Sequence, residues 1–336
     1  MTRFTATLLG LIAAIGAGSA MAQQQPVIIK FSHVAAADTP KGRAAVYFSR
    51  VVDQRTKGRV KVEVYDDSKL YNDATEMAAL QRADVQMLAP SLAKIAALGL
   101  PEFGVFDLPY VFDNYAEVHR VTNSEIGADL LNRLQSKGIV GLAYWDNAFK
   151  QMSANKPLRR PEDAKGLKLR IQDSAVLQAQ MQALDAVPVV MNFSEVAAAL
   201  KAGTVDGTEN PASNFSTQHM QDVQKYLMLT NHGYLGYAVI VNKKFWDALP
   251  ADVRSSLSSA LKDATTFAND IASESNNDAL EALRASGKTE VIRLTAAEKA
   301  AWKKALVKVH RTQESKIGKD LVRAVYKETA FEPDKL

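Results

Sequence analysis

Cysteine is absent from this sequence of 336 residues. The chain therefore has no disulfides, no thiol nucleophile and no cysteine-ligated zinc site. Downstream of the N-terminal apolar run it also lacks the glycine-rich G-x-G-x-x-G and G-x-x-x-x-G-K-[ST] motifs, the H-E-x-x-H zinc motif and the G-x-S-x-G nucleophile elbow. These absences remove the main sequence support for nucleotide binding, zinc-dependent proteolysis and serine hydrolysis.

Neither sign of charge predominates, because the chain has 41 basic and 37 acidic residues and a formal net charge of +4. No basic block is interleaved with aromatic residues, so nucleic acid is not a predicted partner. The histidines are scattered with no pair four residues apart, and a metal site is not predicted: His33, His119, His219, His232 and His310. No cofactor is expected.

One long apolar run is present, and it lies at the N-terminus. It follows Arg3 and ends in Ala20-Met21-Ala22, which fits the small-residue pattern of a signal-peptidase site. We expect residues 1–22 to be a signal peptide that is cleaved before Gln23, and an uncleaved anchor is the alternative. No later stretch has 18 uncharged apolar residues, so the mature chain is predicted to be exported and to work in the periplasm.

Strand and helix patterns alternate in the first part of the chain. Residues 27–34 read as a strand, and Asp38-Thr39-Pro40 offers a helix cap with proline in the first turn. The helix is expected to end near Gly58, and a strand with valine at every second position follows over 60–64. This β-α-β order predicts a mainly parallel sheet. A longer helix is predicted over 117–136.

Two strands are predicted to cross between two lobes, over 140–153 and 234–241. Between them, Leu167, Leu169 and Ile171 share one face of a strand, so Arg170 points away from the core. Ser194 is expected to cap a helix over 195–202. Residues 252–286 contain neither glycine nor proline, which predicts one helix of about 50 Å, longer than one small lobe.

Three polar side chains are candidates for binding an anion. Lys41 lies in the first turn of a helix, whose free amide groups favour negative charge. Arg170 can offer two parallel hydrogen bonds to a carboxylate at the end of a strand. Asn210 precedes Pro211 and could point into a cleft. Each has an alternative: a solvated lysine, a structural salt bridge, and a turn cap.

Many short runs of the sequence resemble one family, the extracytoplasmic solute-binding proteins of tripartite ATP-independent periplasmic (TRAP) transporters, of the DctP type. The runs cover nearly the whole mature chain in order and include Asp38-Thr39-Pro40-Lys41-Gly42, Phe106-Asp107-Leu108-Pro109-Tyr110, Leu169-Arg170-Ile171-Gln172-Asp173-Ser174 and Val205-Asp206-Gly207-Thr208-Glu209-Asn210-Pro211.

The resemblance implies an α/β fold of two lobes with discontinuous domains, two crossover strands and a long bracing helix. The first lobe is expected to comprise 23–147 and 236–275, and the second 148–235 and 276–329. Residues 330–336 are expected to form a C-terminal tail.

The resemblance also implies which residues contact the ligand. Arg170 would be the main carboxylate anchor, with Asn210 beside it and Lys150 as a further basic contact. Lys41 and Ser91 would meet the other end of the ligand from the first lobe. Trp145 and Phe193 would form walls of the cleft.

Relatives of this type bind C4-dicarboxylates such as malate, succinate and fumarate, and two cationic ends would suit two carboxylates. The expected function is therefore capture of such an acid by lobe closure and delivery to TRAP membrane subunits, without catalysis. A sugar acid or a 2-oxo acid as ligand, a periplasmic sensor subunit, and a periplasmic enzyme acting on organic acids are the alternatives.

Overall fold

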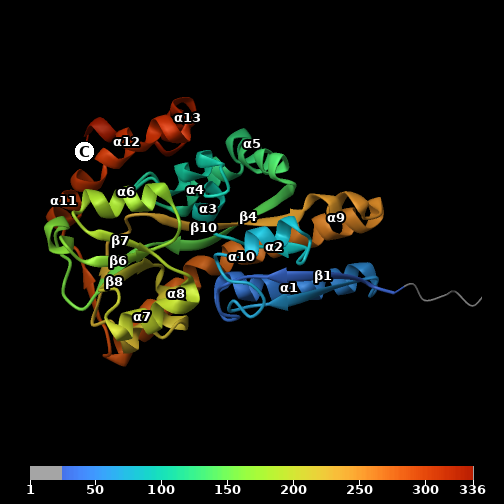
Figure 1. Ribbon diagram of the computed structural model, residues 1–336, viewed down its shortest axis with the longest axis horizontal. Helices are drawn as coiled ribbons and strands as arrows, with labels where there is room; N and C mark the ends of the chain where they lie inside the picture. The colour runs from blue at the N-terminus through green and yellow to red at the C-terminus, as the bar shows by residue number, and fades with distance from the viewer. Residues whose placement is uncertain (1–24, 336) are drawn as a thin grey trace, which may run out of the picture.

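The computed structural model describes residues 25–335, which form two lobes that are each built around one β-sheet (Figure 1). The predicted signal peptide and its cleavage site before Gln23 lie outside the described residues. Within residues 25–335, none of the helices combines the length and the apolar character needed to cross a membrane.

The sheet of the first lobe has the strand order β2-β1-β3-β10-β4. Its strands, in that order, are Val60–Tyr65, Val27–Ser32, Met87–Leu88, Tyr234–Asn242 and Ile139–Phe149. β1 runs parallel to both of its neighbours, whereas β10 runs antiparallel to β3 and β4. The prediction of a mainly parallel sheet is therefore wrong for the β10 half, because β10 returns from the second lobe and enters the sheet from the opposite end.

Helices cover both faces of this sheet. On one face α1 (Pro40–Thr56) and α10 (Ala251–Ser286) share a buried cluster with β1 and β10. The other face carries short helices and one 3-10 segment: α2 (Glu76–Gln81), α3 (Leu92–Ala96), η1 (Pro101–Asp107), α4 (Tyr115–Thr122) and α5 (Glu125–Arg133). The start of α1 is as predicted, since Thr39 is its cap and Pro40 its first residue.

The segment predicted as one helix over 117–136 is broken in two. α4 ends at Thr122, and the Ser124 hydroxyl caps α5 by accepting a hydrogen bond of 3.2 Å from the N–H of Ile126. Asn123 and Ser124 cause the break, because such side chains bond to nearby backbone and favour caps over helix interiors. The 3-10 segment η2 (Leu134–Lys137) follows α5.

The sheet of the second lobe has the order β11-β9-β5-β8-β6-β7. Its strands, in that order, are Glu290–Arg293, Tyr226–Leu229, Gln151–Ala154, Gly207–Asn210, Lys168–Ile171 and Val187–Val190. Besides the C-terminal part of the long helix α10, four helices pack against it: α6 (Ala175–Ala183), α7 (Val196–Ala202), α8 (Ala212–Thr217) and α11 (Ala296–Leu306). The prediction that Ser194 caps α7 is wrong, because Ser194 lies inside the 3-10 turn η4 (Phe193–Glu195) and Glu195 is the cap.

The two predicted crossovers are confirmed, and they lie side by side. β4 of the first sheet continues through Lys150 into β5 of the second, and β9 of the second sheet is followed by β10 of the first. The N–H of Lys150 donates a hydrogen bond of 2.8 Å to the carbonyl of Gly233. The two connections between the lobes are thus hydrogen-bonded to each other, and we refer to this pair of connections as the hinge.

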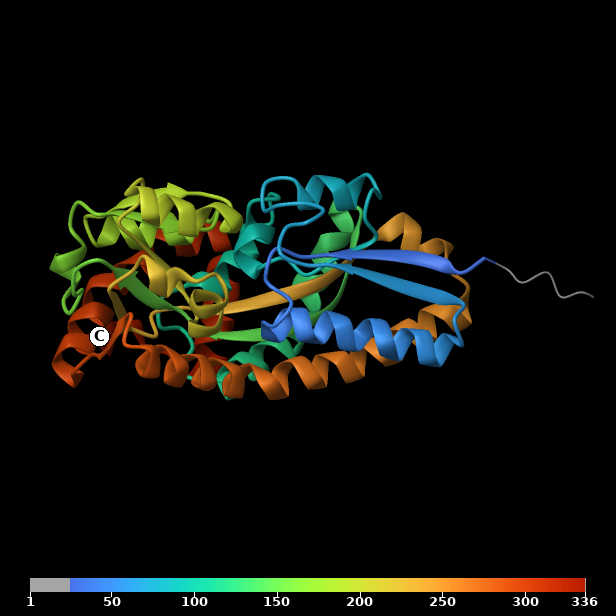
Figure 2. The same ribbon diagram turned by 90° about the horizontal axis from the view of Figure 1, so that it is seen from below.

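α10 braces both lobes, as predicted from the absence of glycine and proline. It has 36 residues and contacts α1 and β4 in the first lobe and α8 and β11 in the second. Figure 2 shows it as the orange helix that runs beneath both lobes. Alanines every fourth residue, Ala260, Ala264, Ala268 and Ala272, are fully buried on one face, so the helix can approach its neighbours closely.

The C-terminal helices contact more than the second lobe, to which 276–329 is predicted to belong. α12 (Lys308–Ile317) and α13 (Lys319–Thr329) place Val309 and Val322 in a cluster that also holds Phe103 and Val118 of the first lobe. The assignment of this stretch to one lobe stays a prediction. The remaining elements are α9 (Lys243–Ala248), η3 (Pro161–Ala164), η5 (Met220–Asp222) and η6 (Pro333–Lys335).

Candidate functional site

Two neighbouring cavities lie between the lobes. The large cavity has a volume of about 390 Å³, and its lining includes Asp73, Met77, Arg170, Met191 and Asn192. The small cavity has a volume of about 10 Å³, and its lining includes Lys41, Ser91, Phe193, Asn210, Asn214 and Tyr237. Lys94 and Gln172 line both cavities, so the two spaces are adjacent parts of one cleft.

Lys41 reaches the small cavity from the first turn of α1. The Thr39 hydroxyl accepts a hydrogen bond of 3.2 Å from the N–H of Gly42 and fixes that turn. The Lys41 ammonium donates to the carbonyl of Ala89 at 3.1 Å and lies 3.9 Å from the centre of the Tyr237 ring. Burial, followed by repulsion from Lys94, lowers the pKa of Lys41 to about 7.

Arg170 reaches the large cavity from β6. Its neighbours Leu169 and Ile171 belong to the core of the second lobe, so the guanidinium projects from the other face of the strand. Its Nε and Nη2 atoms donate to the carbonyl of Met191 at 3.0 and 2.8 Å, and its central carbon lies 5.6 Å from the centre of the Phe193 ring. Burial lowers the pKa of Arg170, and the nearby carboxylates, Asp73 first among them, oppose that shift.

Lys94, on α3, is a buried cation with two carboxylate partners. Its ammonium lies 2.8 Å from Asp73 and also contacts Glu76. Burial lowers the pKa of Lys94, but the two carboxylates outweigh burial and hold that pKa above its usual range. Burial raises the pKa of Asp73, but the ammonium of Lys94 and the N–H of Phe193 dominate and bring it down to about 2. The charge of Lys94 is therefore fully compensated.

Lys150, at the hinge, is compensated in the same way. Its ammonium lies 3.0 Å from Glu209, and the ring of His232 lies 3.3 Å from the same carboxylate. Burial raises the pKa of Glu209, but Lys150 and then His232 outweigh burial and lower it. Lys150 lines neither cavity, so its charge is directed into the hinge.

Four lysine or arginine side chains are buried among the described residues, and they divide into two pairs: Lys94 and Lys150, and Lys41 and Arg170. The first pair forms salt bridges with buried acids. The second pair forms no salt bridge with any of residues 25–335, and donates only to backbone carbonyls. A buried cation without a counter-charge is costly. The cleft therefore holds two buried basic side chains, one from each lobe, that form no salt bridge with the described residues.

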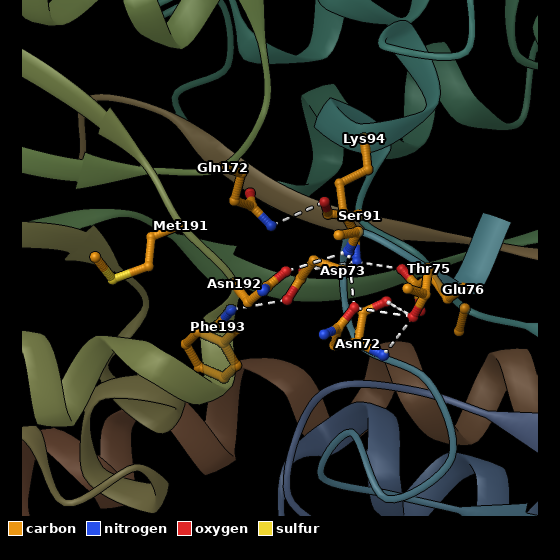
Figure 3. A network of polar contacts seen from close by, with 12 residues as sticks. Asn72, Asp73, Thr75, Glu76, Ser91, Lys94, Gln172, Met191, Asn192 and Phe193 are labelled. Atoms are coloured by element: carbon orange, nitrogen blue, oxygen red, sulfur yellow. Dashed lines mark hydrogen bonds and ion pairs between the residues drawn. The ribbon is translucent and has the colours of Figure 1, made fainter. Parts of the chain in front are cut away.

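Hydrogen bonds join the two lobes across the cleft (Figure 3). Asp73 accepts a hydrogen bond of 2.7 Å from the N–H of Phe193, and the N–H of Ala74 donates to Asn192 at 3.2 Å. Gln172 donates to the hydroxyl of Ser91 at 2.8 Å. A space of about 10 Å³ holds roughly one water molecule, so a four-carbon acid does not fit beside Lys41 in this arrangement of the lobes.

Five of the residues predicted from the sequence line the cleft and two do not. Lys41, Ser91, Phe193 and Asn210 line the small cavity, and Arg170 lines the large one. The amide of Asn210 donates to the Thr208 hydroxyl at 3.3 Å.

Trp145 and Lys150 are the two predicted residues that lie elsewhere. Trp145 is fully buried in the core beside Phe31, where its indole N–H donates to Thr265 at 3.0 Å. It lines neither cavity, because its side chain belongs to the buried cluster that β4 shares with α1 and α10. Lys150 is held by Glu209, as described above.

The residues of the cleft that sequence reasoning missed include Asp73, Lys94, Gln172 and Tyr237. Two of these four carry a local signal. Gln172 lies two residues beyond Arg170 and so projects to the same side of the chain, and Lys94 lies one turn beyond Ser91. Asp73 lies in a loop and Tyr237 in a wholly buried strand, where no local pattern marks a cleft residue.

Comparison with known proteins points to one family. The model of bacterial extracellular solute-binding protein family 7, DctP, matches residues 31–316. A C4-dicarboxylate-binding periplasmic protein DctP of Rhodobacter capsulatus is 54% identical over 328 residues, which cover 98% of each chain.

Solved structures give the same result. A TRAP periplasmic solute-binding protein of Shewanella oneidensis, with bound succinate, matches with a TM-score of 0.89 and 41% identity, over 90% of this chain and 99% of that one. One from Pseudomonas aeruginosa PAO1, with bound L-malate, matches with a TM-score of 0.83 and 42% identity, over 85% of this chain and 100% of that one.

The pairing of Lys94 with two buried acids predicts a measurable effect on stability. Lys94→Met should lower the free energy of unfolding by about 3–5 kcal/mol, because Asp73 and Glu76 would stay buried without their counter-ion. Arg55→Met is the matched control: its partner Asp263 is 42% exposed, so the loss should be at most about 1 kcal/mol. Denaturant unfolding of both variants measures the difference, and equal losses would contradict the assignment.

Proposed function

Because the chain belongs to bacterial extracellular solute-binding protein family 7, the DctP family, we propose that it captures C4-dicarboxylates such as malate, succinate and fumarate between its lobes. It then delivers them to the membrane subunits of a TRAP transporter. The observation that carries the choice of ligand is the pair of uncompensated cations, Lys41 in the first lobe and Arg170 in the second.

The acid is held by one carboxylate at each end. Arg170 anchors the first carboxylate with its planar guanidinium, which can form two parallel hydrogen bonds, while Phe193 covers the guanidinium and Asn210 donates beside it. Lys41 receives the second carboxylate, with Ser91 at its side. Lys150 and Trp145 act indirectly, by fixing the hinge and the core of the first lobe.

Lobe closure follows from this arrangement, because the two cations belong to different lobes. A dicarboxylate that contacts both binds the closed form better than the open form, and that difference in affinity drives closure. Closure also excludes water, which strengthens both ion pairs. The hinge is formed by the two crossovers at Lys150 and Gly233, and α10 limits the motion because it contacts both lobes.

We propose that the lobes comprise 23–147 with 236–275, and 148–235 with 276–329, and that 330–336 is a tail. The chain is exported to the periplasm after cleavage near Ala22. Its role is binding and not catalysis, which is supported by membership of a family of substrate-binding transport proteins.

A site with one cation at each end predicts that a dicarboxylate binds more tightly than a monocarboxylate of the same length. Succinate should bind about 10- to 150-fold more tightly than butyrate, because butyrate leaves one buried cation without its partner. In Lys41→Met the two acids should bind about equally, since the second carboxylate loses its partner. Arg43→Met, on the exposed side of the same helix, should keep the wild-type ratio. Calorimetry measures all three, and an unchanged ratio in Lys41→Met would count against the proposal.

The low pKa of Lys41 predicts that affinity depends on pH. The free protein loses the Lys41 proton as the pH rises through about 7, while a bound carboxylate favours the charged ammonium. Affinity for succinate should therefore fall by about tenfold for each pH unit above pH 8, with uptake of nearly one proton per ligand.

Calorimetry in buffers of different ionisation enthalpy measures this proton uptake directly. In Lys41→Met both the uptake and the steep fall in affinity should disappear. Affinity that stays constant from pH 7 to pH 9 in the wild-type protein would show that Lys41 is already charged, or does not meet the ligand.

A further inference from the structure

Gln172 occupies a special position in the cleft. It follows β6 directly and lies two residues beyond Arg170, on the same side of the chain. It lines both the large cavity, to which Arg170 belongs, and the small cavity, to which Lys41 belongs. Its amide donates across the lobes to Ser91 at 2.8 Å, as seen near the centre of Figure 3.

This position puts Gln172 beside the middle of a ligand, not beside its ends. Under the proposed function one carboxylate lies at Arg170 and the other at Lys41, so the two central carbons pass the side chains that border both cavities, Gln172 and Lys94. Lys94 is already paired with Asp73 and Glu76. Succinate and malate have the same two carboxylates, so the two cations cannot distinguish them. Only a group that faces the central carbons can do so.

The second polar atom of this amide has no partner among the described residues. The Oε1 atom of Gln172 is buried and accepts no hydrogen bond from any of residues 25–335. A buried acceptor without a partner carries a desolvation penalty, which a donor on the ligand removes. A hydroxyl group fits this need, and because it both donates and accepts it would satisfy the amide in either orientation about its last bond.

We propose that Gln172 is a specificity-determining residue, which makes the site prefer a 2-hydroxy-C4-dicarboxylate to the unsubstituted dicarboxylate. The inference rests on the proposed function, since it requires a ligand that spans Lys41 and Arg170. In the complex with malate, the hydroxyl donates to Oε1 of Gln172. In the complex with succinate, a methylene group faces the same atom and leaves it unpaired.

Calorimetry with malate and succinate tests this on the wild-type protein, on Gln172→Met, which keeps the length of the side chain, and on Gln172→Ala. The wild-type protein should bind malate about 5- to 150-fold more tightly than succinate, from the cost of one unpaired buried polar group. In both variants the ratio of the two dissociation constants should fall to about 1.

Gln180→Met is the matched control. Gln180 on α6 is also buried, donates to the carbonyl of Asp107, and has an Oε1 atom without a partner among the described residues, but it lines neither cavity. Its substitution should leave the malate-to-succinate ratio at the wild-type value, even if the protein becomes less stable.

The possible results distinguish a failure of the proposed function from a failure of the role of Gln172. If the wild-type protein binds neither acid, the proposed function is wrong and this inference fails with it. If it binds both acids and the ratio is the same in the wild-type protein, Gln172→Met and Gln172→Ala, only the role of Gln172 is overturned. A wild-type ratio near 1 overturns it in the same way.

Discussion

The cost of burying a cation without a counter-charge is the constraint on which this structure depends. Desolvation of an ammonium or guanidinium costs several kcal/mol even after the protein relaxes, and four such groups are buried here. Lys94 and Lys150 recover that cost from acids of the same chain. Lys41 and Arg170 form no such pairs. Under the proposed function a bound dicarboxylate supplies their counter-charges, and the same two contacts favour closure of the lobes.

The fold places these two cations on different lobes, so a relative motion of the lobes would change the distance between them. Each is attached to a rigid element of its own lobe, Lys41 to the capped start of α1 and Arg170 to the end of β6. The hinge strands are bonded to each other at Lys150 and Gly233, and the compensated ion pair of Lys150 and Glu209 is buried at the same place. The paired charges of Lys150 and Glu209 therefore lie where the chain crosses between the lobes, while the pair of Lys94 and Asp73 lies in the cleft with Lys41 and Arg170, which form no salt bridge.

Local patterns predicted much of this arrangement. The Thr39-Pro40 cap placed Lys41 in a first helical turn, alternation along β6 turned Arg170 away from the core, and an uninterrupted run predicted α10. What could not be predicted depends on distant partners. Lys150 is held at the hinge by Glu209, 59 residues away. Trp145 is held in the core of the first lobe, where its indole donates to Thr265, 120 residues away. The direction of β10 was missed for the same reason, because strand pairing is settled between segments far apart in the sequence.

A crystal structure of the complex with succinate tests the central claim most directly. One carboxylate should lie within hydrogen-bonding distance of the Lys41 ammonium and the other against the Arg170 guanidinium, while Lys94 keeps Asp73 and Glu76 and Lys150 keeps Glu209. A succinate held with both carboxylates in one lobe, or one that takes Lys94 or Lys150 away from its acidic partner, would contradict the claim that two uncompensated cations select the ligand.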